Sequence, residues 1–162
     1  MTYTNSSLVS YTKLSPNHSG QRTHSIDRIT PHCVVGQCSV ETLGNIFLPT
    51  SRQASCNYGI GVDGRVGMYV EEKNRSWCSS SSANDQRAVT IECASDTTEP
   101  YAFKDMVYQT LIAFQKGVDQ HFSEFISRTF LISIAVLTHS LNGSFNSSIQ
   151  IIILAELLKH SP

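Results

Sequence analysis

Apolar and polar positions follow several distinct spacings along the first two thirds of the chain. Runs rich in β-branched residues at Ile29–Val35 and Ala88–Cys93 predict two buried strands, although Pro31 restricts the first to a sheet edge or to the residues after it. Apolar residues recur at helical spacing behind Ser39, which can cap a short helix that ends near Leu48.

A hairpin signal lies in the middle of the chain. Two apolar runs, Ser55–Val62 and Arg65–Val70, are joined at Asp63 and Gly64, and an Asp-Gly pair between such runs is a strong hairpin indication. The polar stretch Glu71–Arg87 that follows predicts a long surface loop.

Strands, a hairpin and helices are therefore mixed. A last apolar stripe predicts a helix from about Phe103 to Lys116. We predict an α/β protein with a mixed central sheet flanked by helices, whose C-terminal part is incomplete or divergent. The organisation we expect is an extended lead-in over residues 1–25, a domain core over 26–116 and a divergent tail over 117–162.

The tail differs from the rest in composition. Only four charged side chains occur in residues 121–162, and dense Ile/Leu runs alternate there with Ser/Asn stretches at no clean period. This composition is typical of translation in another reading frame, or of a splice to unrelated sequence. Reading the nucleotide sequence in the neighbouring frames tests that hypothesis.

Composition and charge exclude several partners. The chain has 162 residues, 15% charged residues and a formal net charge of -1, so no basic excess predicts binding to nucleic acid. The start, Met1–Ser10, has no apolar segment typical of a signal peptide, and no apolar run reaches the ~20 residues of a membrane span. An odd count of five cysteines does not indicate a disulfide framework.

Two side chains are candidates for chemistry. His32 lies at the end of the first strand, where it is either a structural residue or a metal ligand, since imidazole is a common zinc donor. Its neighbour Cys33 points to the opposite face, because successive strand residues alternate. Glu92 lies in an otherwise apolar strand, where it is either exposed at an edge or faces a site as a general base.

Four segments in the same order resemble the type 2 amidase family, also called the peptidoglycan-recognition fold, and in particular the version in clostridial prophages. They contain the strand with His32, the hairpin, the loop with a tryptophan and the strand that ends at Glu92, and they span residues 26–37, 54–65, 71–77 and 84–92.

The resemblance implies zinc-dependent hydrolysis of the amide between N-acetylmuramic acid and L-alanine of the peptidoglycan stem peptide. It implies that His32 is a zinc ligand and Glu92 the catalytic residue that takes a proton from water. Asn57, Trp77 and Asn84 would then contact the substrate.

The metal site departs from the family pattern. The family takes its other two ligands from a region after the long helix, where His139 faintly resembles the second one. No cysteine follows Cys93 and no aspartate follows Asp119, so the third ligand is missing. The alternative is therefore a non-catalytic module that binds peptidoglycan without zinc. A cysteine hydrolase that uses Cys33 or Cys56 is a further reading.

The expected location follows from the same resemblance. A protein without a signal peptide is synthesised in the cytoplasm, and it reaches the bacterial cell wall only after release. Release of an endolysin-like protein would need a partner such as a holin.

Overall fold

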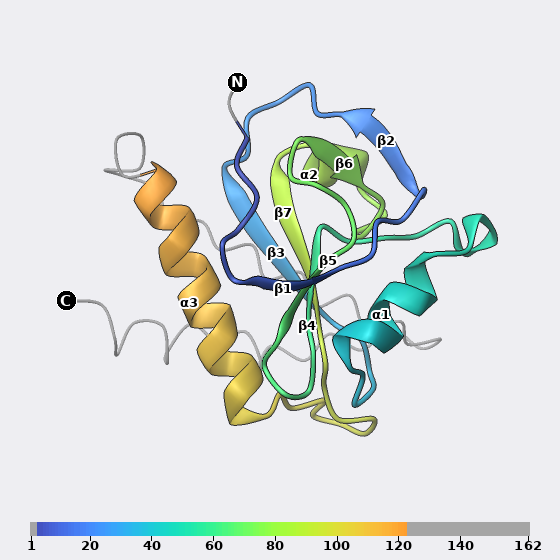
Figure 1. Ribbon diagram of the computed structural model, residues 1–162, viewed down its shortest axis with the longest axis vertical. Coiled ribbons are helices and arrows are strands. Elements are labelled where there is room, and N and C mark those ends of the chain that lie inside the picture. The colour runs from blue at the N-terminus through green and yellow to red at the C-terminus, as the bar shows by residue number, and fades with distance from the viewer. Residues whose placement is uncertain (1–2, 123–162) are drawn as a thin grey trace.

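A five-stranded mixed sheet forms the centre of the computed structural model, which describes residues 3–122. Its strand order is β1-β5-β4-β7-β3 (Figure 1). The bounds are Val9–Thr12 for β1, Val66–Met68 for β5, Tyr58–Ile60 for β4, Ala88–Cys93 for β7 and Arg28–Cys33 for β3. The pair β4 and β5 is antiparallel and the other three pairs are parallel, so the predicted mixed α/β class is confirmed.

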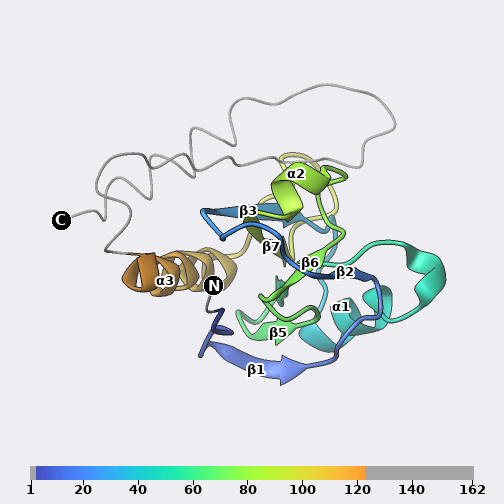
Figure 2. The same ribbon diagram turned by 90° about the horizontal axis from the view of Figure 1, so that it is seen from above.

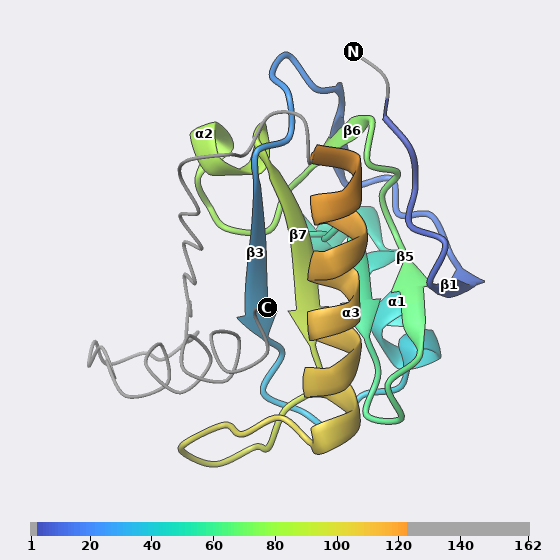
Figure 3. The same ribbon diagram turned by 90° about the vertical axis from the view of Figure 1, so that its left-hand side faces the viewer.

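Two helices cover opposite faces of this sheet. The long helix α3, Asp105–Phe122, lies along one face, and α1, Val40–Phe47, lies on the other (Figures 2 and 3). Under α3, the ring of Phe114 packs on Tyr58 with 4.8 Å between ring centroids. Alternate residues of β7 face α3, which leaves the residues between them to face the α1 side.

Local signals explain where these elements begin and turn. Ser39 caps α1, because its hydroxyl accepts a hydrogen bond from the Thr42 amide at 3.2 Å. The hairpin between β4 and β5 turns at Gly64, whose φ of 79° suits glycine, and the Gly64 amide donates to the Gly61 carbonyl at 2.8 Å. The predicted helix and hairpin are both confirmed.

The segment Glu71–Arg87 differs from its prediction. It was expected to be a surface loop, but it contains strand β6, Asn74–Ser76, and a short helix α2, Ser82–Asp85. Ser76 and Asp85 are both buried. The loop prediction is wrong because this polar stretch is stabilised by buried hydrogen bonds, which leave no apolar periodicity in the sequence.

The lead-in contributes two strands. β1 extends the main sheet, and β2, His18–Gln21, pairs antiparallel with β6 in a separate two-stranded sheet. Between these strands the Asn17 side chain is buried and donates to the carbonyls of Phe47 and Pro49. The N-terminal segment is thus fixed to the end of α1.

Strand β3 tolerates Pro31 because it pairs on one side with β7 and forms an edge of the described sheet. After β7 the chain passes through a turn at Glu99 and Pro100 and enters α3, which continues past its predicted end at Lys116. The tail and His139 lie outside the described residues. Within residues 3–122, no helix combines the length and hydrophobicity that a bilayer span requires.

Candidate active site

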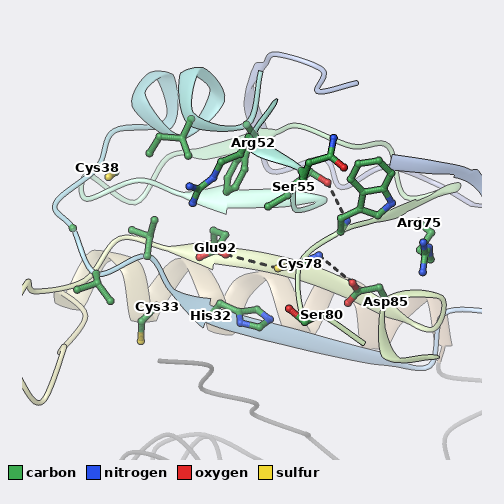
Figure 4. Close-up of a pocket in the computed structure, with 18 of the residues that line it drawn as sticks. His32, Cys33, Cys38, Arg52, Ser55, Arg75, Cys78, Ser80, Asp85 and Glu92 are labelled. Atoms are coloured by element: carbon green, nitrogen blue, oxygen red, sulfur yellow. Dashed lines mark hydrogen bonds between the residues drawn. The ribbon is translucent and has the colours of Figure 1, made fainter. Parts of the chain in front are cut away.

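His32 and Glu92 face a common cavity of about 800 Å³. The two residues are direct partners in the parallel register of β3 and β7, so their side chains leave the same face of the sheet. Figure 4 shows the Glu92 side chain next to Cys78, with His32 on the neighbouring strand. The structure therefore brings together the two residues that the sequence analysis selected for chemistry.

The His32 ring offers a nitrogen without a protein partner. The residue is 4% exposed, and its Nε2 atom has no hydrogen bond among the described residues. Burial lowers the pKa of His32, and the nearby charge of Asp85 opposes that effect only in part. The imidazole is thus held neutral near pH 7, with a buried nitrogen that a ligand can satisfy.

The Glu92 carboxyl is held close to half-protonation at neutral pH. Its burial raises the pKa to about 7, against the opposing effects of a hydrogen bond from Cys78 and the positive charge of Arg52. A carboxyl group with this pKa can accept and return a proton near pH 7. This property is the one that a general base or acid requires.

The buried carboxylate of Asp85 holds in place the segment with Cys78, which lines the cavity next to Glu92. Asp85 accepts hydrogen bonds from the backbone amides of Cys78 at 3.0 Å and Ser79 at 3.2 Å, and from the Ser79 hydroxyl. It occupies the last position of α2, whose first turn is capped by Ser81. The Asp85 carboxylate therefore holds the polar segment Ser79–Asp85 in place through hydrogen bonds within that segment and to Cys78.

Trp77 forms another part of the cavity lining. Its indole Nε1 donates to the Ser19 hydroxyl at 2.6 Å, and its backbone amide donates to the Ser55 hydroxyl at 3.1 Å. The ring is half-buried and cannot rotate without breaking the bond to Ser19. An indole held in this way offers a fixed flat surface at the cavity.

The other two predicted substrate contacts lie elsewhere. Asn57 is fully buried and does not line the cavity; its carboxamide oxygen accepts from Arg22 at 2.8 Å and from the Thr90 amide at 3.2 Å. Asn84 donates to Thr30 at 3.2 Å and also lies outside the cavity lining. Both side chains make hydrogen bonds within the fold, so their contact with a substrate stays a prediction.

The cysteines do not form a nucleophilic site. Cys33 packs in the core under α3, where burial raises the pKa of its thiol to about 11. Cys56 is fully buried, and burial raises the pKa of its thiol well above the ordinary value. A cysteine nucleophile needs the opposite shift, so the cysteine-hydrolase interpretation lacks support.

Sequence reasoning assigned no individual role to Cys78, Asp85 or Arg52, which all line the cavity. Cys78 and Asp85 lie in the segment predicted to be a surface loop, and Arg52 follows α1 in a short 3-10 helix, Thr50–Arg52. The one local signal was Ser81, which stands three residues before Asn84 in the pattern of a helix cap.

The residues described do not complete a metal site. The unpartnered His32 Nε2 fits one bond to a zinc ion. Over residues 3–122, however, no three His, Cys, Asp or Glu side chains converge in a way that could hold a metal. The described donor set therefore falls short of the three protein ligands that a catalytic zinc usually has.

The sheet order, the two covering helices and the cavity define a protein with the type 2 amidase fold. Among solved structures, the chain is similar to a selenomethionine derivative of AmpD, with a TM-score of 0.57 and 17% identity over 75% of this chain and 80% of that one. It is also similar to a mutant endolysin from Bacillus subtilis, with a TM-score of 0.55 and 13% identity over 70% of this chain and 76% of that one.

A third structure, PlyL, has a TM-score of 0.55 and 10% identity over 70% of this chain and 74% of that one. No protein-family model matches the sequence, and no curated protein matches it either. The predicted fold is confirmed, and at these identities the likeness concerns the fold alone.

Proposed function

We propose that the protein acts on bacterial peptidoglycan as an amidase that cleaves the bond between N-acetylmuramic acid and L-alanine of the stem peptide. One observation carries the proposal: His32 and Glu92 are register partners on adjacent strands and face the same cavity. The fold shared with AmpD and with endolysins supports peptidoglycan as the substrate.

In this proposal Glu92 is the catalytic residue. With a pKa of about 7, its carboxylate accepts a proton from the attacking water and then returns it to the leaving amine of L-alanine. Trp77 is a substrate-binding residue, because its fixed indole can stack on a sugar or peptide plane at the cavity. Asn57 and Asn84 support the site from within the fold.

Zinc is the metal that the family resemblance implies, and it would polarise the scissile carbonyl and activate water. His32 is the residue that would hold it. Because the described residues supply no set of three ligands, we derive no step through the metal.

The incomplete set of metal donors in residues 3–122 favours a second candidate function. Because no three metal donors converge within residues 3–122, the protein is also suited to bind peptidoglycan without cutting it, as a non-catalytic module. Either function places the protein at the cell wall. The amidase proposal also includes release of the protein to the cell wall by a partner such as a holin.

The two functions are separated by digestion of purified cell walls. The full chain is incubated with insoluble peptidoglycan, and soluble peptides with a newly freed N-terminal L-alanine are quantified by mass spectrometry. We expect release by the wild type and none by His32→Ala. His24→Ala is the matched control, because His24 is exposed and its ring contacts only the neighbouring Thr23 in the hydrogen bonds described.

Two outcomes of this experiment would contradict the amidase function. If the wild type sediments with the walls but releases no stem peptide, the binding-module function replaces the amidase function. If it neither sediments nor releases peptide, peptidoglycan is not the ligand.

A further inference from the structure

The Glu92 carboxylate has one hydrogen-bonding side-chain neighbour within the described residues. The Cys78 Sγ atom lies 3.8 Å from Glu92 Oε1, a distance suited to an S–H donor (Figure 4). The two residues come from different elements, since Glu92 is on β7 and Cys78 follows β6. Their contact therefore links β7 to the segment that follows β6.

Cys78 is itself held in place by the backbone. Asp85 accepts its amide hydrogen at 3.0 Å and the next amide, that of Ser79, at 3.2 Å. Asp85 is 3% exposed, so these bonds are protected from water. The preceding Trp77 amide is fixed in turn by the Ser55 hydroxyl at 3.1 Å. The thiol therefore approaches Glu92 from a segment with little freedom to move.

The thiol stays protonated in this position. Burial and the charge of Glu92 raise the pKa of Cys78 well above its ordinary value. A protonated thiol can donate one hydrogen bond but is a poor nucleophile. The Cys78 side chain thus suits the role of a hydrogen-bond donor and not that of a reacting group.

We propose that Cys78 is a positioning residue, whose thiol fixes one oxygen of the Glu92 carboxylate and leaves the other oxygen directed at the reacting water. This inference rests on the proposed amidase function for its catalytic meaning. The hydrogen bond itself is a claim about the protein alone, and it can be tested separately.

Kinetics on the full chain test the catalytic part. Cys78→Ala removes the donor, and we expect kcat for stem-peptide release to fall about tenfold with KM unchanged, because a donor to a charged group is lost. Cys78→Ser keeps a donor and should restore most of the rate. Cys93→Ala is the matched control, since it also removes a buried thiol but on the α3 side of the sheet and outside the cavity lining.

Two kinetic results would overturn the positioning role. One is an unchanged kcat in Cys78→Ala, and the other is an equal loss in the serine and alanine variants. Thermal unfolding of each variant is measured alongside, so that a loss of folded protein is not read as a loss of positioning.

Infrared spectroscopy tests the hydrogen bond without any activity. The S–H stretching band of Cys78 is identified as the band missing in Cys78→Ala. We expect it to move to higher frequency in Glu92→Ala, because the acceptor is gone. A band that does not move in Glu92→Ala refutes the hydrogen bond. If the band moves but the wild type releases no stem peptide, the hydrogen bond is established, whereas the amidase function and the catalytic role of Cys78 are refuted.

Discussion

Replacing Glu92 by glutamine should make the protein more stable at alkaline pH. The carboxyl has a pKa of about 7 in the fold, against 4.5 for the free side chain, because burial disfavours its charge. The folded state therefore binds the proton more tightly than the unfolded state. The stability that this group provides is complete below pH 4.5 and is lost as the pH rises to about 7.

The size of the effect follows from the same two values. A pKa difference between 4.5 and about 7 corresponds to roughly 3 kcal/mol in the free energy of unfolding. Because Glu92 is half-buried and solvent screens part of its charge, we expect a gain of about 2 kcal/mol for Glu92→Gln near pH 8 and almost none near pH 4. Glutamine keeps an oxygen that can accept from Cys78, so this contact is conserved.

Urea unfolding at both pH values measures this difference. Glu71→Gln is the control: Glu71 forms an ion pair with the exposed Lys73 outside the cavity, so its change should stay within about 0.5 kcal/mol at both pH values. Titration of His32 is common to all variants and cancels in the comparison. An equal effect of Glu92→Gln at the two pH values, or a loss of stability near pH 8, would refute the reasoning.

Three further predictions concern the fold, the substrate and the metal. Asn57→Ala should lower the free energy of unfolding by about 3 kcal/mol, because it removes the buried acceptor of the Thr90 amide and of the Arg22 Nη2 group; a loss below about 1 kcal/mol in urea unfolding would contradict this. Trp77→Ala should weaken cosedimentation of the folded protein with cell walls about tenfold, measured well below the unfolding midpoint of the variant, and undiminished cosedimentation would remove Trp77 from the binding surface. Zinc uptake should be weak, because no three donors converge around His32 in the described part; one zinc ion per chain by elemental analysis would contradict this.

The elements with local signals were predicted well. Ser39 indicates the start of α1, and the pair Asp63 and Gly64 indicates the hairpin, because capping and tight turns depend on a few neighbouring residues. The pairing of His32 with Glu92 was also accessible, since both lie at the ends of apolar strands and the family resemblance places them together.

The rest depends on contacts that the sequence does not display. Strand β1 is short and polar at every second position, and its partner β5 lies more than fifty residues away. Asn57 was assigned to the substrate because it precedes a strand in a matched segment, but its burial results from Arg22 and Thr90, which lie far from it in sequence. Asp85 was placed in a loop because a buried carboxylate that bonds backbone amides leaves no apolar pattern around it.

The central claim is that Glu92, beside His32 in one cavity, transfers the proton when the muramoyl amide is cut. The most direct measurement is turnover of a soluble N-acetylmuramoyl-L-alanyl peptide by the wild type and by Glu92→Gln, with products identified by mass spectrometry. We predict cleavage at the muramoyl–alanine bond by the wild type, and binding without cleavage by Glu92→Gln. Cleavage by Glu92→Gln at the wild-type rate, or wild-type cleavage at any other bond, would contradict the account.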